Sequence, residues 1–311
     1  MKKVVFMGTP DFAVPALQAL IASEEYDVAL VICQPDKPQG RKQILTAPPV
    51  KQLAVQSGVP VYQPNTLKTE EAYETIRACA PDFIVVSAYG KILPKNVLDL
   101  PRYGCVNLHG SLLPKYRGAA PVQWSVINGD PVSGVTTMLM DVGLDTGDML
   151  LRETVEIGPE ETAGELFDRL AALCPALLLK TLKGLEEGVI VPEKQNEAEA
   201  TYVGMLDKAM AEIDWTKDAG TLHDLIRGLN PWPVAKTKFD RKIFKIYSSR
   251  VCEHSIMGAE GELTAKDGRL FVCCGGGTSL ELLEVQLEGA KRMSASDFLR
   301  GHSPAPHFTL G

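Results

Sequence analysis

The sequence lacks the patterns that mark disulfide-rich, zinc-binding or membrane-spanning proteins. Its seven cysteines, an odd number, are scattered through 311 residues without a Cys-x-x-Cys pair, so neither a disulfide framework nor a zinc ribbon is expected. The five histidines form no His-x-x-x-His or mixed His/Cys group, and we expect no metal. No apolar run is long enough for a signal peptide or a bilayer-spanning helix. We therefore expect a protein of the reducing cytoplasm that is neither secreted nor embedded in a membrane.

The sequence also has no overall excess of positive charge. The formal net charge of -7 by itself argues against a nucleic-acid partner. From Leu206 onward, however, 14 basic residues balance 14 acidic ones, so the first two thirds of the chain carry the whole acidic excess. Residues 236–250 contain six basic side chains and one acid, which are either the solvated face of short strands or a surface that contacts phosphates. The six are Lys236, Lys238, Arg241, Lys242, Lys245 and Arg250.

Glycine is missing where a dinucleotide-binding loop would need it. The first apolar strand ends at Gly8, but the residues that follow are Thr-Pro-Asp, without the second and third glycines that bring a backbone close to pyrophosphate. We therefore expect no nicotinamide cofactor. Gly8 is interpreted as a strand-to-helix turn with Asp11 as the helix N-cap, and the alternative is a pocket wall at the carboxyl end of a sheet.

Apolar strand-like runs alternate with helical patterns over roughly the first 190 residues. Unbroken apolar strands that alternate with helices are typical of a parallel sheet covered on both faces. The sequence thus predicts an α/β fold, with a Rossmann-like catalytic domain over residues 1–189 that ends in a long helix, 162–187. The main expected strands are 3–7, 28–33, 59–62 and 83–87, followed by the strand that contains Asn107, and the helices include 49–57, 70–79 and 121–128.

The last third of the chain has a different pattern. Residues 190–207 are polar and are interpreted as a linker. Residues 208–311 show one helical pattern, 221–229, and several short alternating strands separated by glycines, which predicts a small OB-like β-barrel. The five expected strands are 235–239, 243–249, 261–265, 269–273 and 280–285.

Two polar side chains stand where an apolar strand meets a loop rich in proline and glycine. Asn107 and His109 are two residues apart, so on a strand they point to the same side and one pocket can hold both. Asp145 lies in a downstream turn of glycines and aspartates. Asp145 can orient the imidazole and stabilise its charge, while Asn107 donates its amide to an oxygen that becomes negative. This set suits acyl transfer to an amine.

Ser111 is the rival candidate for a nucleophile. It lacks the Gly-x-Ser-x-Gly elbow that exposes a catalytic serine. We therefore interpret Ser111 as a turn or cap residue.

The run Asn107-Leu-His-Gly-Ser-Leu-Leu-Pro-Lys-Tyr-Arg-Gly118 closely resembles the signature of formyltransferases that use 10-formyltetrahydrofolate as formyl donor. Asp145 matches the third catalytic position of that family. The resemblance implies that Asn107 and His109 stabilise a tetrahedral oxyanion while Asp145 keeps His109 suitably protonated. It also implies a folate-binding set made of Tyr89, Gly90, Ser111, Leu112, Leu113, Pro114, Asp141 and Gly143.

The resemblance extends over the whole chain for those members that formylate initiator Met-tRNA. It includes Met7-Gly-Thr-Pro-Asp-Phe-Ala13, Ile213-Asp-Trp215 and Asn230-Pro-Trp-Pro-Val-Ala235. Judged alone, residues 34–46 are an ordinary surface loop, but the resemblance implies that this loop enters the acceptor stem. The family is also known for a carboxyl-terminal barrel that helps to hold tRNA, and we expect a monomer. The implied tRNA-binding residues are Lys37, Arg41, Lys42, Lys208, Lys242 and Lys245.

Three alternatives remain open at this point. A formyltransferase that acts on a nucleotide-linked amino sugar shares the signature, although the basic loop and Asn-Pro-Trp-Pro argue for tRNA. A glycinamide formyltransferase would normally end near the first domain and has proline where this chain has Gly110. A non-catalytic folate- or RNA-binding module is at odds with the intact Asn, His and Asp set.

Overall fold

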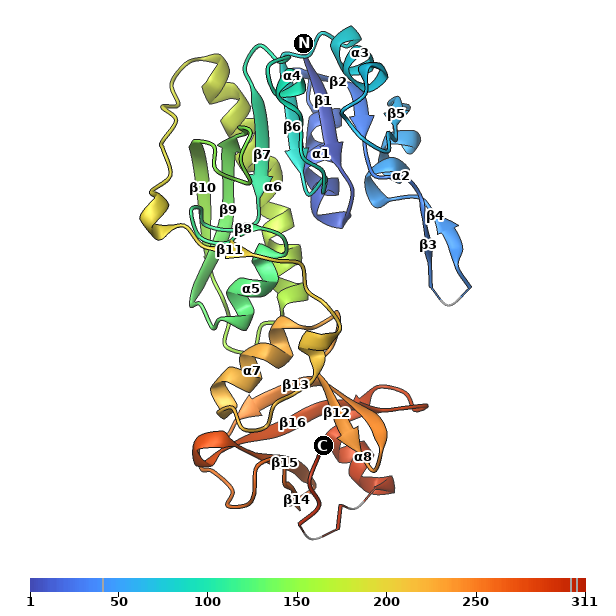
Figure 1. Ribbon diagram of the computed structural model, residues 1–311, viewed down its shortest axis with the longest axis vertical. Helices are drawn as coiled ribbons and strands as arrows, with labels where there is room; N and C mark the ends of the chain where they lie inside the picture. Colours follow the sequence, from blue (N-terminus) through green and yellow to red (C-terminus); the bar gives the residue numbers. More distant parts are fainter. Residues whose placement is uncertain (41, 303, 306) are drawn as a thin grey trace. The chain divides into compact units, whose positions relative to one another are not determined.

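The computed structural model of the protein describes residues 1–40, 42–302, 304–305 and 307–311 (Figure 1). The chain divides into two compact units. The first comprises Met1–Gly118, Ser133–Val155 and Phe167–Val203, and the second comprises Ala119–Val132, Glu156–Leu166 and Gly204–Gly311.

A seven-stranded sheet forms the centre of the first unit, and its first five strands are parallel to their neighbours. Strand β9 runs antiparallel to β7, and β10 lies beyond it at the edge. Counted along the chain within this sheet, the order is 3-2-1-4-5-6-7, the doubly wound arrangement whose ligands bind beyond the carboxyl ends of the strands. The predicted α/β fold is confirmed, but the sheet is mostly rather than wholly parallel, because β9 is antiparallel to β7. In spatial order the strands are β5 (Val61–Tyr62), β2 (Tyr26–Ile32), β1 (Lys2–Gly8), β6 (Phe83–Ser87), β7 (Cys105–His109), β9 (Val132–Leu139) and β10 (Met149–Glu156).

Helices pack on this sheet through their apolar sides. In α3, Ala72 and Ile76 join Val5, Ile84 and Cys105 of the strands in one buried cluster. All five side chains of β6 are buried, which requires cover on both faces of the sheet. The helices are α1 (Val14–Ala22), α2 (Pro49–Gln56), α3 (Glu70–Ala78), α4 (Lys95–Leu98) and α6 (Ala163–Glu186), whose residues from Phe167 onward belong to this unit.

The interpretation of Asp11 as a helix N-cap is wrong. Asp11 begins a short 3-10 turn, η1 (Asp11–Ala13), and within the part of the chain that the structure describes, no side chain caps that turn or the following helix α1. Proline at the start of α1 presets a helical φ and has no N–H that needs a partner, so the helix begins without a capping carboxylate.

The loop between residues 34 and 46 contains a small hairpin that the sequence does not predict. Strands β3 (Lys37–Gln39) and β4 (Ile44–Thr46) pair antiparallel, with Lys37 opposite Thr46. Figure 1 shows the hairpin extending away from the central sheet. Its base is fixed because Lys51 Nζ donates to both carboxylate oxygens of Asp36 at 2.8–2.9 Å and to Gln63 Oε1 at 2.8 Å.

An antiparallel sheet forms the core of the second unit, in the order β12-β13-β16-β15-β14, with β17 beside β16. The five predicted strands are present, but a closed barrel is not found: among the described residues, no pairing joins β14 to β12. Helix α8 is an addition to the predicted pattern, and its Phe298 packs in the core with Phe244. The elements are α5 (Pro121–Ile127), α7 (Ala219–Gly228), β12 (Lys236–Phe239), β13 (Lys242–Val251), β14 (Leu263–Lys266), β15 (Arg269–Cys274), β16 (Thr278–Leu287), β17 (Met293–Ser294) and α8 (Ala295–Gly301).

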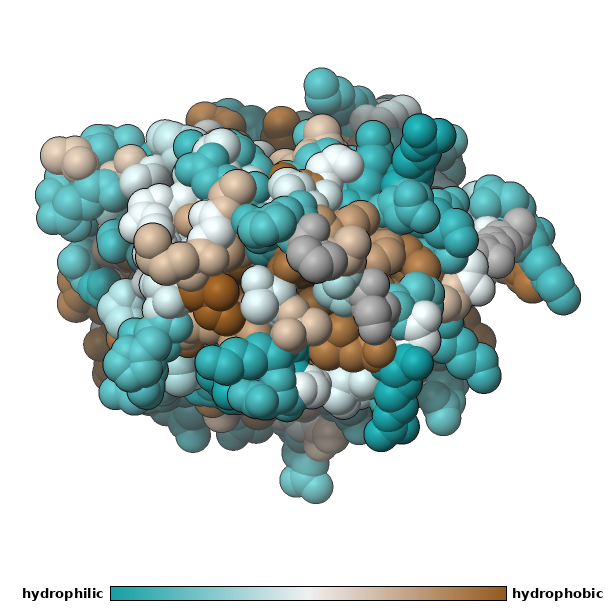
Figure 2. All heavy atoms as spheres, turned by 90° about the horizontal axis from the view of Figure 1, so that it is seen from below, coloured by the Kyte–Doolittle hydropathy of each residue, from teal (hydrophilic) through white to brown (hydrophobic). Residues whose placement is uncertain are grey.

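The surface is mixed in polarity. The face drawn in Figure 2 has hydrophilic side chains around its margin and apolar ones nearer its centre. In the described part of the chain, no helix has both the length and the apolar character needed to cross a bilayer.

Candidate active site

The predicted pair Asn107 and His109 lies at the carboxyl end of β7, an interior strand between β6 and β9. Only 7% of Asn107 and 6% of His109 is exposed. Cys105, two residues earlier, belongs to the core on the same side, and burial raises the pKa of its thiol to about 12, so it stays protonated and is no nucleophile. Among the described residues, no hydrogen bond engages the Asn107 carboxamide, which leaves it available to a ligand.

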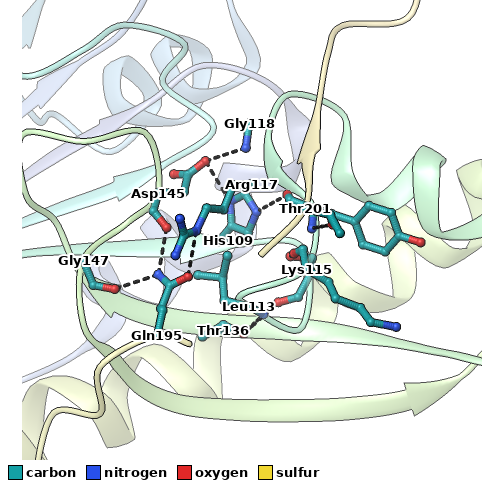
Figure 3. A network of polar contacts seen from close by, with 12 residues as sticks. His109, Leu113, Lys115, Arg117, Gly118, Thr136, Asp145, Gly147, Gln195 and Thr201 are labelled. Atoms are coloured by element: carbon teal, nitrogen blue, oxygen red, sulfur yellow. Dashed lines mark hydrogen bonds and ion pairs between the residues drawn. The ribbon is translucent and has the colours of Figure 1, made fainter. Parts of the chain in front are cut away.

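The two ring nitrogens of His109 have different roles. Nε2 lies 2.9 Å from the carbonyl oxygen of Tyr116. A carbonyl only accepts hydrogen bonds, so Nε2 carries a hydrogen and donates it. Nδ1 lies 3.7 Å from Asp145 Oδ2, an ion-pair distance that is too long for a hydrogen bond. Nδ1 is therefore the ring nitrogen that is left for proton transfer (Figure 3).

The turn after β9 brings Asp145 to this histidine. The end of β9 pairs with the first half of β7, where Leu139 lies opposite Val106, so the turn must fold back to reach His109. Asp145 Oδ2 accepts a hydrogen bond from Gly118 N at 2.8 Å. The backbone of Asp145 is left-handed, with φ of +54°, which costs a non-glycine residue roughly 1 kcal/mol.

The turn itself is shaped by Asp141, one of the predicted folate-binding residues. Its Oδ1 accepts hydrogen bonds from Gly143 N at 2.9 Å and from Thr146 Oγ1 at 2.6 Å. Asp141 and Gly143 therefore lie in the same turn as Asp145, and the Asp141 carboxylate holds the conformation of that turn.

The loop that follows β7 is tied to β9. Ser111 Oγ donates to the carbonyl of Lys115 at 2.6 Å, which fits its interpretation as a turn residue. Thr136 Oγ1 donates to Ser111 O at 2.7 Å and accepts from Leu113 N at 3.2 Å. Leu113 and Pro114 are buried, and Leu113 packs with two methionines of β9 and β10; Leu112 is half-buried.

Tyr89 and Gly90 lie just past the carboxyl end of β6, the strand next to β7. The Tyr89 carbonyl accepts hydrogen bonds from Gln34 Nε2 at 3.0 Å and Thr9 Oγ1 at 3.3 Å, which joins the loops after β1, β2 and β6. These loops meet where the strand order reverses, the usual ligand position in a doubly wound sheet. The predicted folate-binding residues therefore line neighbouring strand ends.

The predicted tRNA-binding lysines fall in both units. Lys37 is exposed on β3 and Lys42 is exposed in the turn between β3 and β4, while Arg41 lies outside the described residues. Lys208 and Lys242 are exposed in the second unit.

Lys245 lies on the other face of β13 from Lys242, because side chains alternate along a strand. The register places Lys236 opposite Lys245, and Lys236 also forms an ion pair with Glu212 at 2.8 Å. Lys245 therefore lies on the same face of the sheet as Lys236 and Lys238, whereas Lys242 lies on the opposite face.

Arg117 and Gln195 are part of the site although the sequence assigned neither a role. Arg117 Nε donates to Gln195 Oε1 at 2.9 Å, and Gln195 Nε2 donates to the carbonyls of Asp145 and Gly147, each at 2.7 Å (Figure 3). Gln195 stands among glutamates in a segment that looks like a solvated linker. In the described ranges, no group of three or more His, Cys, Asp or Glu side chains could hold a metal ion.

Two protein families match separate parts of the chain. Residues 1–182 match the formyl transferase family, and residues 205–303 match its C-terminal domain family. The chain is 49% identical over 310 residues to the methionyl-tRNA formyltransferase of Acidobacterium capsulatum, with 99% of each chain covered. It is 50% identical over 311 residues to that of Citrifermentans bemidjiense, covering 99% of this chain and 96% of the relative.

Among solved structures, an N-formyltransferase of Helicobacter canadensis in complex with folinic acid and dTDP-3-aminofucose has a TM-score of 0.68. The alignment covers 91% of this chain and 99% of the other. With 20% identity, this likeness shows a shared fold.

Proposed function

The chain belongs to the formyl transferase family, and we propose from this that it transfers the formyl group of 10-formyltetrahydrofolate to the α-amine of methionine on initiator Met-tRNA, for translation initiation. The observation that carries the proposal is the nearly full-length match to methionyl-tRNA formyltransferases, because the sugar-modifying neighbour shares the fold at only 20% identity. The catalytic set is Asn107, His109 and Asp145.

The proposed reaction is a nucleophilic substitution at the formyl carbon. The methionyl amine, with an ordinary pKa of about 8, attacks the formyl carbon in its neutral form. A bond forms from the amine nitrogen to that carbon, the bond from the carbon to the folate nitrogen breaks, and one proton passes from the amine to the departing nitrogen. Asn107 and a protonated His109 donate to the oxygen that becomes negative, each contributing on the order of 3 kcal/mol.

Asp145 completes the set through its position beside Nδ1 of His109. Because Nε2 is engaged by the Tyr116 carbonyl, Nδ1 is the nitrogen that donates to the oxyanion and exchanges a proton. The 3.7 Å separation from Asp145 Oδ2 places a carboxylate where it compensates positive charge on the ring.

We propose the division of labour that the sequence predicts, with residues 1–189 as the catalytic domain and residues 208–311 as an OB-like domain that binds tRNA. The predicted linker, residues 190–207, contributes its residues up to Val203 to the first compact unit. The match of residues 205–303 to the C-terminal formyl transferase family supports the assignment of the second domain. The folate substrate lies at the strand ends described above, and the protein acts as a cytoplasmic monomer.

An acceptor comparison tests the function. The purified protein is given 10-formyltetrahydrofolate and either initiator Met-tRNA, uncharged tRNA or a dTDP-linked 3-amino sugar, and formylated product is quantified. We expect formyl transfer to Met-tRNA only, since the free α-amine and the tRNA body are both needed. Transfer to the amino sugar at a comparable rate would show that the alternative acceptor class is correct.

The hairpin and the β13 lysines predict a salt-dependent interaction with RNA. Lys37→Ala combined with Lys42→Ala should weaken binding of Met-tRNA, and the slope of log affinity against log salt should fall by roughly one for each phosphate that a lysine no longer neutralises. Lys242→Ala with Lys245→Ala tests the second unit in the same way, and Arg41→Ala tests the third basic residue of the segment 34–46.

Lys68→Ala, at an exposed lysine of the first unit, is the matched control. The KM for the folate should stay within about twofold in all variants. An unchanged salt slope would remove the altered lysines from the RNA-binding set.

A further inference from the structure

Arg117 is fully buried, which is unusual for an arginine. A buried guanidinium is tolerated only when its charge is paired and its donors are used. Nη1 donates to Glu197 Oε2 at 3.0 Å and to the Tyr202 hydroxyl at 2.7 Å, and Nη2 donates to Glu197 Oε1 at 2.7 Å. Together with the Nε bond to Gln195, every one of these partners lies in residues 193–203, which we call the strap.

The strap is held at both ends. At its start, Glu193 exchanges two backbone hydrogen bonds of 2.8 Å with Met149, the first residue of β10. At its end, β11 (Tyr202–Val203) pairs parallel with β8 (Arg117–Gly118). The strap therefore has a fixed position beside the turn of residues 141–147, which contains Asp145.

Gln195 connects the strap to that turn in a single orientation. Its Oε1 accepts from Arg117, and both protons of Nε2 go to carbonyls of the turn, those of Asp145 and Gly147. A flipped amide would place Oε1 against two carbonyl oxygens and its NH₂ group against a guanidinium. Arg117 thus determines which atom of Gln195 faces the turn.

The side-chain carboxylate and the backbone carbonyl of Asp145 are both held through the dipeptide Arg117–Gly118. The carboxylate accepts from Gly118 N, and the carbonyl accepts from Gln195, which Arg117 orients. These bonds hold a left-handed backbone that an aspartate adopts at a cost. The same residue presents its Oδ2 to His109 Nδ1.

We propose that Arg117 and Gln195 are positioning residues, which hold Asp145 at its distance from His109 through the Gln195 amide. The inference rests on the proposed function, since it concerns the catalytic carboxylate of that reaction. Neither side chain touches the reacting atoms, so their loss should lower kcat and leave KM for both substrates nearly unchanged.

Two variants of Gln195 separate positioning from simple packing. Gln195→Glu keeps an acceptor for Arg117 but has no donor for the turn carbonyls, whereas Gln195→Met keeps the volume and loses both functions. We expect both to lower kcat by about tenfold or more and to change the pH profile of kcat, with KM within about twofold. Lys194→Ala, at the exposed neighbouring residue, should behave as wild type.

A measurement that does not require catalytic turnover separates the test of this inference from the test of the proposed function. In ¹³C-histidine NMR spectra, with the His109 signal assigned by its loss in His109→Ala, the pH titration of His109 should shift in Gln195→Met and not in Lys194→Ala. Wild-type kcat and an unmoved His109 titration in Gln195→Met would overturn the inference. So would normal kcat in Gln195→Glu, which would reduce Gln195 to an anchor for Arg117. Failure of the wild type to formylate Met-tRNA would count against the proposed function alone.

Discussion

Replacement of Asn107 or His109 by alanine is expected to lower kcat for formyl transfer by about 10²–10³-fold, while Met-tRNA still binds. Both side chains lie at the same strand end, and in the proposed mechanism both donate to the oxygen that becomes negative only in the transition state. Their loss therefore affects the chemical step rather than binding. Steady-state formylation and a separate tRNA-binding assay measure the two effects.

Lys115→Ala is the control, because this residue is exposed and contributes to the loop after β7 through its backbone N–H and carbonyl, which alanine keeps. The double variant Asn107→Ala with His109→Ala should lose less than the product of the two single losses, since residues that act on one oxygen are not additive. Near-normal turnover in either single variant would refute the assignment of that residue.

Gly147→Ala should reduce both stability and activity. A Cβ at Gly147 would lie 1.8 Å from the carbonyl oxygen of Leu139 and 2.9 Å from its carbon, and neither backbone atom can move without opening the end of β9. We expect the free energy of unfolding to fall by about 1–3 kcal/mol. Activity should fall as well, because the Gly147 carbonyl is one of the two that Gln195 holds.

Denaturant midpoints and kcat, compared with Gly204→Ala, measure these effects. A Cβ at Gly204 would have no atom of the described residues within 4 Å, and Gly204 has no left-handed φ, so alanine should be accepted there. An unchanged midpoint together with full activity in Gly147→Ala would mean that the turn adapts without cost.

The parts of the fold that follow from the sequence are those with strong local signals. Strand β6 is predicted at 83–87 and is found at Phe83–Ser87, because a fully apolar run between turns fits only a strand that is buried on both sides. Helix α8 is not predicted because it has only seven residues, although Ser294 accepts from Asp297 N in the Ser-x-x-Asp pattern of a helix start. The β3–β4 hairpin has strands of three residues each, which are too short to carry a pattern that predicts them.

The candidate site also contains residues that the sequence predicts and residues that it does not. Asn107 and His109 follow from strand alternation. Asp145 follows from its turn of glycines and aspartates and from the family resemblance, but its approach to His109 depends on how that turn folds back. The role of Gln195 has no sequence signal, because its partners on the catalytic turn are backbone carbonyls that any residue type supplies. Whether a sheet closes into a barrel is a global property, so the strand pattern predicts the strands of the second unit but not their closure, and no closure is found among the described residues.

The strap also determines where the chain can be cut. A fragment that ends at residue 182, the limit of the first family match, would retain Arg117 and lose all of its hydrogen-bonding partners on residues 195–202. It would leave a guanidinium in the interior without its counter-ion, and the Asp145 turn without its donor. Truncation and domain-exchange experiments on the first unit should therefore retain the chain through Val203, so that the catalytic half carries its own support.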